Sequence, residues 1–300
     1  MRPAFSVLFL TTLIGAAQGL FIALFFVELL APSGLSRGFY AGGAFIVLGL
    51  SALGGISSVF HLGHPERAWR AMSKWRTSWL AREGIALPAF MAAAFAWGVA
   101  HWLELGHTFA LGVAGVVLAI ALFICTGMIY AAIKVLKEWS HPLTLVNFIL
   151  FGCASGATLA AAYAGFAAPG LAAPLAQTAF GLTVAVLVTR SASLWRNATL
   201  RPVSTMQTAL GIRHPRITQK AQGAMGGSFN TREFFHGKSP AFLRGVLAAM
   251  LLGAFVLPLA LVLVAPLAAF LFQYAGLLAE RWYFFAEAQH PQNLYYQTVG

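Results

Sequence analysis

The sequence contains no aspartate and few charged residues of any kind. Only 9% of its 300 residues are charged, whereas 59% are hydrophobic. A soluble domain of ordinary composition carries roughly 25% charged residues, because its surface must face water. A chain this poor in charge cannot cover such a surface, so much of it must face lipid. We therefore predict an all-α integral membrane protein.

Acidic residues are scarce relative to basic ones. Eight glutamates stand against 19 Lys and Arg residues, which gives a formal net charge of +11. In a soluble protein this excess would suggest a nucleic-acid partner. In a membrane protein, the bias of positive residues toward the cytoplasm and the attraction to anionic headgroups explain it. We expect membrane lipids as partners, and no nucleic acid.

Cysteine is also scarce, with only Cys125 and Cys153, each inside an apolar run. Without a C-x-x-C pattern the chain is expected to bind no iron–sulfur cluster and no metal of its own. Both cysteines are interpreted as small buried apolar side chains. Any redox centre must then come from a site without cysteine, a diffusible cofactor or a partner.

Long apolar stretches, by contrast, are abundant. Eight stretches predict a bundle of eight transmembrane helices. One integral-membrane domain over residues 1–300 is the simplest organisation, and the last two helices are separated only by a short stretch that ends at Pro266. The predicted helices lie at about 4–30, 39–61, 83–104, 109–132, 142–166, 173–194, 241–263 and 267–286.

The positive residues indicate the orientation of these helices. With residue 1 in the cytoplasm, 18 of the 19 Lys and Arg residues fall on the cytoplasmic side and only Arg37 falls outside. The positive-inside rule therefore predicts that both termini are cytoplasmic, in the inner membrane of a bacterium. The long connection at about 195–240 is basic and rich in glycine. It is either a flexible cytoplasmic loop or a docking surface for a soluble subunit.

The connection between the second and third helices carries the most chemical information. Its tryptophans and interleaved cations suit a segment at headgroup level. His61 lies where the second helix leaves the apolar layer, and Glu83 lies where the third helix enters it. If these helix ends are adjacent, an imidazole and a carboxyl face each other there and can exchange protons with a quinone headgroup. The simpler alternative is an interfacial histidine and a solvated Glu–Arg pair.

Haem is the competing redox group, because a b-type haem needs axial ligands on helices that face one pocket. No pair of histidines lies in the middle of the predicted membrane layer. His61 or His64 could pair with His141 on the inner side. An intrinsic b-type haem is nevertheless not expected.

Several uncharged or isolated residues within the helices also carry predictions. Gln18 and Gln273 lie in apolar runs and are expected to hydrogen-bond to other helices, with a place in the wall of a cavity as the alternative. Glu28 and Glu104, near the outer ends of the first and third helices, are expected to be interfacial. Close helix packing is predicted at six glycines: Gly15, Gly19, Gly42, Gly43, Gly54 and Gly55.

Three stretches resemble the membrane-anchor subunit of the dimethyl sulfoxide reductase family: Pro3–Gly19, His61–Glu83 and Phe285–His290. The resemblance extends over essentially the whole chain. It implies an anchor that does not itself act on the terminal substrate. Two soluble subunits would dock on its cytoplasmic face, a molybdopterin catalytic subunit and an electron-transfer subunit with four iron–sulfur clusters. Such an anchor exchanges electrons with ubiquinone or menaquinone and normally carries no haem.

The resemblance also implies the residues of the site. His61 and Glu83 match the histidine and glutamate implicated in quinol binding, and weaker candidates for quinone binding are His64, Arg67, Arg76 and Arg82. Relatives of this family serve quinol-oxidising complexes of anaerobic respiration and also complexes that oxidise sulfite and reduce quinone. The general appearance of the sequence favours the second branch. A polytopic transporter and an inert anchor without a quinone site remain as alternatives.

Overall fold

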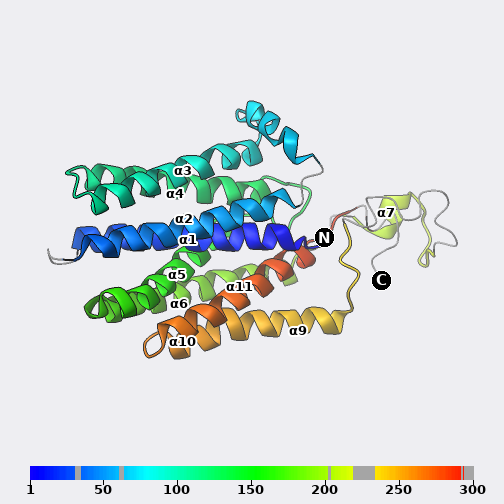
Figure 1. The fold of residues 1–300 in the computed structure, drawn as a ribbon. Coiled ribbons are helices and arrows are strands. Elements are labelled where there is room, and N and C mark those ends of the chain that lie inside the picture. Colours follow the sequence, from blue (N-terminus) through cyan, green and yellow to red (C-terminus); the bar gives the residue numbers. More distant parts are fainter. Residues whose placement is uncertain (31–34, 61–63, 202–203, 219–233, 292, 294–300) are drawn as a thin grey trace.

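The computed structural model describes residues 1–30, 35–60, 64–201, 204–218, 234–291 and 293, and all its described elements are helical. Most of the helices run side by side as an elongated bundle (Figure 1). In chain order the elements are α1 (Phe5–Leu30), α2 (Arg37–Val59), η1 (Pro65–Lys74), α3 (Trp79–Trp102), α4 (Thr108–Ala131), α5 (Pro142–Ala167), η2 (Pro169–Leu171), α6 (Ala172–Ala198), α7 (Met206–Leu210), α9 (Pro240–Leu251), η4 (Leu252–Val256), α10 (Leu257–Leu261) and α11 (Pro266–Glu287).

Seven helical segments in the described chain are long and apolar enough to cross a membrane. One of them, Pro240–Leu261, consists of α9, the π-helical turn η4 and α10. A helix therefore lies at each of the eight predicted positions. The eighth, α11, packs along the bundle but is not one of these seven segments, and it carries Glu280, Arg281 and Glu287.

Local capping explains where the helices begin. The hydroxyl of Ser36 accepts a hydrogen bond from the N–H of Phe39, and Ser239 caps α9 in the same way. Ser78 accepts from the N–H of Ala81 at 3.3 Å, so α3 begins at Trp79. The sequence predicted a start at 83. The difference places Glu83 one turn inside the helix rather than at its first residue.

Small residues bring α1 and α5 into direct backbone contact. A Cβ atom added at Gly156 would fall on the backbone of Gly19 and Leu20, and one added at Gly19 would fall on Gly152. Lipid provides no hydrophobic force between helices, so this close approach is how such pairs gain packing energy. The predicted close contacts at Gly15 and Gly19 are confirmed.

Aromatic and amide side chains complete the packing between helices. Phe21 of α1 makes edge-to-face contacts with Phe90 and Trp97 of α3. The predicted interhelical hydrogen bonds of both glutamines are present. Gln18 donates to the carbonyl of Ala119 at 2.8 Å, and Gln273 donates to the hydroxyl of Thr183 at 3.1 Å.

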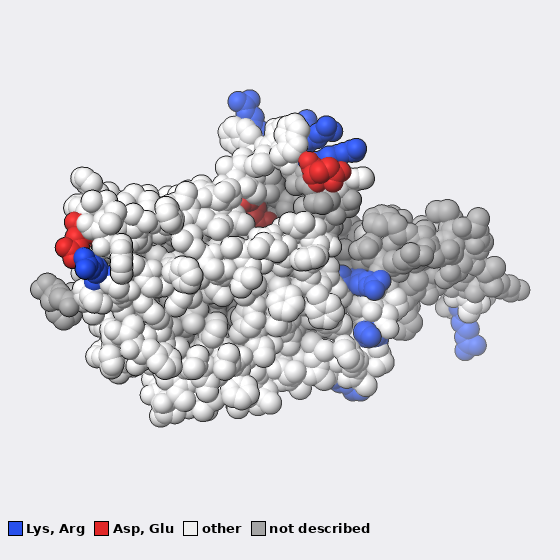
Figure 2. All heavy atoms as spheres, in the orientation of Figure 1, with Lys and Arg blue, Asp and Glu red and all other residues white. Residues whose placement is uncertain are grey.

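Charge is concentrated at one end of the bundle, which we call the basic end. It is the end where α1, α3, α5 and α9 begin and where α2, α4, α6 and α11 finish. Figure 2 shows Lys and Arg gathered there, with a broad middle that is almost free of charge. Of the Lys and Arg residues that the structure describes, only Arg37 lies at the opposite end, where it pairs with Glu104 at 3.5 Å.

Candidate functional site

Glu83 lies inside the bundle near the basic end. Its side chain comes from the second turn of α3, and the residue is 8% exposed. The hydroxyl of Thr126, on α4, donates a hydrogen bond of 2.5 Å to the Glu83 carboxyl. Pro88 has no N–H to give to the carbonyl of Gly84, so the α3 backbone beside Glu83 also lacks one helical hydrogen bond.

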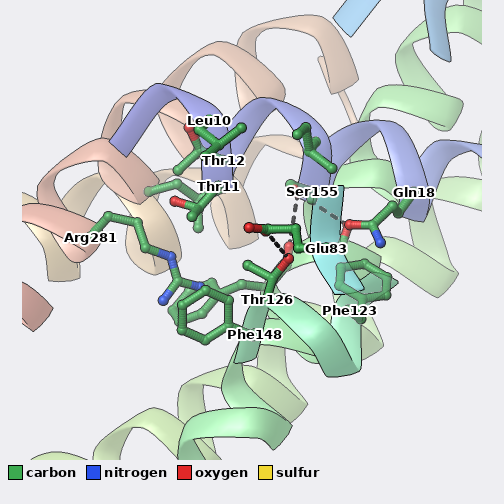
Figure 3. A pocket seen from close by; sticks show the side chains of 15 residues that line it. Leu10, Thr11, Thr12, Gln18, Glu83, Phe123, Thr126, Phe148, Ser155 and Arg281 are labelled. Atoms are coloured by element: carbon green, nitrogen blue, oxygen red, sulfur yellow. Dashed lines mark hydrogen bonds between the residues drawn. The ribbon is translucent and has the colours of Figure 1, made fainter. Parts of the chain in front are cut away.

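A small cavity adjoins the Glu83 carboxyl. Five helices contribute to its wall, and Figure 3 shows the side chains turned toward it. The cavity offers about 20 Å³ to the centres of water molecules, which is enough for one or two waters and too little for an aromatic ring. Its polar lining comes from Thr11, Thr12, Gln18, Glu83, Thr126, Ser155 and Arg281.

The histidines predicted for the site are placed differently. His61 lies outside the described residues, so its position relative to Glu83 stays a prediction. His64 is exposed, and its Nδ1 atom lies 3.0 Å from a carboxyl oxygen of Glu66. The Nε atom of Arg67 lies 3.6 Å from the same carboxyl. These exposed side chains flank the start of η1 and do not line the cavity at Glu83.

Arg76 and Arg82 also point away from the cavity. The guanidinium of Arg82 lies 4.2 Å from the ring centroid of Trp79 and donates to the backbone carbonyls of Trp75 and Arg76. The guanidinium of Arg76 lies 5.5 Å from the ring centroid of Trp75. Both arginines therefore belong to an exposed surface of cations and aromatic rings around η1, and their role in binding stays a prediction.

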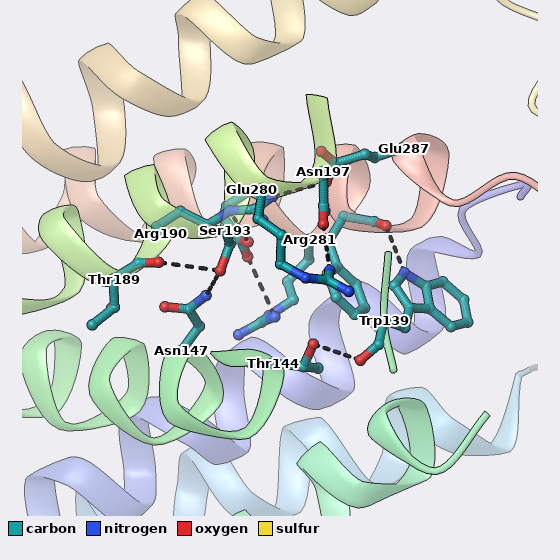
Figure 4. A network of polar contacts seen from close by, with 12 residues as sticks. Trp139, Thr144, Asn147, Thr189, Arg190, Ser193, Asn197, Glu280, Arg281 and Glu287 are labelled. Carbon is teal, nitrogen blue, oxygen red and sulfur yellow. Dashed lines mark hydrogen bonds and ion pairs between the residues drawn. The ribbon is translucent and has the colours of Figure 1, made fainter. Parts of the chain in front are cut away.

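A buried ionic network between α6 and α11 was missed by the sequence analysis (Figure 4). Arg190 Nε lies 3.1 Å from Glu280 Oε1, and Arg281 Nη1 lies 3.4 Å from Glu280 Oε2. Arg190 Nη2 also lies 3.7 Å from Glu287 Oε2. The side chains of Arg190, Glu280 and Arg281 are at most 4% exposed.

The signal for this network was present in the sequence. Arg190 and Arg281 were counted among the cytoplasmic charges, and Glu280 was given no role. All three lie inside apolar runs, and an ionisable residue in such a run normally faces the interior of the bundle. The position inside the run, more than the total charge, was the informative feature.

A second polar cluster lies at the opposite end of the bundle. Trp97 Nε1 donates to Glu28 Oε2 at 2.9 Å, and His101 Nε2 lies 3.4 Å from Glu28 Oε1. Tyr40 stacks on the His101 ring at 4.2 Å. Glu28 was expected to be interfacial, but its side chain is only 14% exposed because these three partners enclose it.

Outside the membrane-spanning segments, the surroundings of His141 and His236 lower the pKa of each imidazole and so disfavour its charged form. Burial, helped by the nearby Arg196, lowers the pKa of His141, whose Nδ1 accepts a hydrogen bond from the N–H of Leu143. Burial also lowers the pKa of His236. Within the described part of the chain, no group of three or more His, Cys or Glu side chains is arranged to hold a metal ion.

Comparison with known proteins agrees with this architecture of long apolar helices. Residues 1–215 match the family described as DMSO reductase anchor subunit (DmsC), and the chain belongs to that family. The chain is also 49% identical over 326 aligned positions to a subunit of the sulfite dehydrogenase of Allochromatium vinosum, with both chains covered completely.

Proposed function

We propose that this protein is the quinone-reactive membrane anchor of a molybdopterin oxidoreductase complex. It would pass electrons between the quinone pool and the iron–sulfur clusters of a soluble partner subunit. The similarity to a sulfite dehydrogenase subunit favours a complex that oxidises sulfite and reduces quinone. The anchor itself would not act on sulfite, and the molybdopterin subunit would do so.

The proposed orientation has eight transmembrane helices, with both chain ends and the basic end in the cytoplasm of a bacterial cell. Two observations support it. The asymmetry of Lys and Arg follows the positive-inside rule, and the backbone nitrogen of Met1 donates a 2.7 Å hydrogen bond to the carbonyl of Ala288, so both ends of the bundle's chain lie together. The basic end would then be the docking face for the soluble subunits.

The single observation that carries the quinone assignment is the interior carboxyl of Glu83. Quinone reduction consumes two protons, and quinol oxidation releases two. A carboxyl that is nearly inaccessible to solvent, has a hydroxyl partner and adjoins space for water can take up or release such protons. Its location near the basic end would bring this chemistry close to the electron carrier of a docked partner.

The small size of the cavity constrains how Glu83 would act. A quinone ring does not fit in it, so Glu83 would exchange protons with the headgroup through water or after a local movement of η1. Met72 of η1 already packs beside Gly84 in α3. The flanking side chains Phe60, Trp69 and Trp75 are more than half exposed and offer an aromatic surface to a prenylated ring.

A photoreactive azidoquinone tests this proposal on the purified complex. After illumination and digestion, mass spectrometry is expected to find the label in the segment from η1 to the first turns of α3, between residues 65 and 87. Excess unlabelled decylubiquinone should suppress this labelling. The rival cluster of Glu28, Tyr40 and His101 at the opposite end serves as the internal control.

Two results would contradict the proposal. Competed labelling at the opposite end would show that quinone binds there. No competed labelling anywhere in the chain, in a complex that remains active with a soluble dye, would indicate an inert anchor.

A further inference from the structure

Three cavities with shared lining residues lie between Glu83 and the basic end of the bundle. The cavity at Glu83 shares Phe148 and Arg281 with a second cavity between α5, α6 and α11. The second cavity shares Glu138 and Asn197 with a third, larger chamber. They offer about 20, 10 and 470 Å³ to the centres of water molecules. The first cavity has room for one or two waters, the second for about one, and the third for many waters.

The wall of the second cavity contains two buried oxygen atoms that accept no hydrogen bond from the described residues. They are Oδ1 of Asn147 and Oε2 of Glu280, and the latter has only the 3.4 Å ion pair with Arg281 among the described residues. Glu280 is only 1% exposed. Buried polar atoms of this kind are usually satisfied by ordered water. The second cavity is therefore expected to hold water between Glu280 and Asn147.

An ionic network of this kind would stabilise the contact between two helices only weakly. Buried ion pairs contribute little net stability, and apolar side chains of similar volume often do as well or better. Charges within a membrane domain more often mark a path for ions or protons. The network runs along the same line as the cavities, since Arg281 lines the first two and Glu287 lines the third.

We propose that these cavities and the carboxyls of Glu280, Glu287 and Glu138 form a proton path between Glu83 and the basic end. This inference rests on the proposed quinone chemistry at Glu83. Each quinone that is reduced takes two electrons from the iron–sulfur partner and two protons, which form its two O–H bonds. Glu83 supplies these protons and recovers them through the path. Quinol oxidation uses the same path in the opposite direction.

The charges of the network suit this role. Arg190 and Arg281 are balanced by Glu280 and Glu287, so a proton that enters does not meet a net positive charge. The two guanidiniums also fix the orientation of the Glu280 carboxyl. Arg281 is held in turn by the face of Phe148, with its Cζ atom 3.6 Å from the ring centroid. Glu138 and Glu287 are more accessible and stand where the path meets the third chamber.

Glu280→Gln in the complete complex tests the path. Gln keeps the size of the side chain and removes its ability to carry a proton. With sulfite as donor and decylubiquinone as acceptor, turnover is expected to fall at least tenfold, while turnover with ferricyanide stays within twofold of wild type. A small weak acid such as formate should restore part of the lost quinone turnover, which it would not do if Glu280 were only structural.

Control variants make the result specific. Glu104→Gln makes the same change in an exposed glutamate at the opposite end and should leave both activities unchanged. If Glu280→Gln does not assemble, because two buried arginines lose their counter-charge, the double variant Arg190→Gln with Glu280→Gln removes one charge of each sign. Glu138→Gln changes the mouth of the path without altering a buried charge, and it should slow quinone turnover by a smaller factor.

The outcomes separate this inference from the proposed function. If assembled Glu280→Gln, or the double variant in its place, reduces quinone within twofold of wild type, the proton path is wrong and the quinone site stands. The path is also wrong if quinone turnover falls and formate does not restore it. If the wild-type complex reduces no quinone at all, the proposed function is wrong and this inference fails with it.

Discussion

Glu83 and Thr126 come from different helices and meet in the interior of the bundle. The 2.5 Å distance between their oxygens is typical of a hydrogen bond with a charged or strongly polarised partner. Thr126 is itself only 6% exposed, so solvent water has little access to compete for its hydroxyl. The pair fixes the direction of the carboxyl toward the cavity, and a carboxyl that must exchange protons needs this orientation.

Thr126→Val tests that orientation. The replacement keeps the shape of the side chain and removes its hydroxyl, which is worth about 0.5–1.5 kcal/mol in a typical hydrogen bond. We expect quinone turnover of the complex to fall by a factor between about 2 and about 13, as this free energy implies. The measurement is the rate with decylubiquinone relative to the rate with ferricyanide.

Thr158→Val is the matched control for this substitution. Thr158 is also buried, and among the described residues its hydroxyl bonds only to the carbonyl of Ala154 in its own helix. It should therefore leave the ratio of the two rates unchanged. Equal losses in both variants would mean that the hydroxyl of Thr126 does not orient Glu83.

At this scale the sequence predicted the candidate residue but not its setting. Glu83 stood out because it followed a run of tryptophans and arginines where the third helix enters the apolar layer, and its expected proximity to His61 stays a prediction. Because Ser78 caps α3, the helix begins four residues earlier than predicted. Glu83 therefore lies inside the helix and points inward to Thr126. Partners such as Thr126 and Arg281 could not be predicted, since they lie far away in sequence.

The contact between α1 and α5 is a direct backbone approach of two long helices, and it aligns residues that line the first cavity. Gly152 of α5 and Gly15 of α1 both belong to its wall. Helix positions were predicted to within a few residues because apolar length and polar caps are local properties. Which helices touch depends on pairs of small residues, and only one partner of each pair was noticed in the sequence.

Gly156→Val is expected to separate these two helices. Its side chain would meet the backbone of Gly19 and Leu20, which cannot move aside as a side chain can. Overpacking of this kind costs about 1–3 kcal/mol or more. The apparent melting temperature of the purified complex in detergent should therefore fall by several degrees.

Gly165→Val separates this effect from the general cost of valine in a helix. Gly165 lies in the same helix, and a Cβ atom added there would meet nothing within 4 Å. The melting temperature of the complex that carries Gly165→Val should stay close to that of the wild type. If Gly156→Val were as stable as Gly165→Val, the close contact between α1 and α5 would be refuted.

On the scale of the whole molecule, the charge asymmetry sets one end apart, and this is the end proposed above as the docking face for soluble partners. The basic end carries η1 and the turn between α4 and α5, with its lysines Lys134 and Lys137. The sequence predicted this polarity well, because counting Lys and Arg needs no knowledge of contacts. It could not predict that Arg190 of α6 would pair with Glu280 of α11, since this depends on how the two helices face each other.

Single cysteines introduced at the two ends test the orientation. In a chain with Cys125 and Cys153 replaced by Ala, an impermeant maleimide is expected to label Gly170→Cys in intact cells. It should label Ser73→Cys only after the cells are opened. Both positions are exposed, Gly170 in η2 and Ser73 in η1 at the basic end. The reverse pattern would put the basic end outside the cell and exclude a cytoplasmic partner.

The most direct test of the account is Glu83→Gln in the assembled complex. The ratio of decylubiquinone turnover to ferricyanide turnover should fall about a hundredfold or more, as expected when a group that transfers protons is lost. Glu28→Gln, which alters a largely buried glutamate at the opposite end, should leave the ratio close to that of the wild type. A Glu83→Gln complex that assembles and keeps the wild-type ratio would contradict the claim that quinone chemistry depends on this carboxyl.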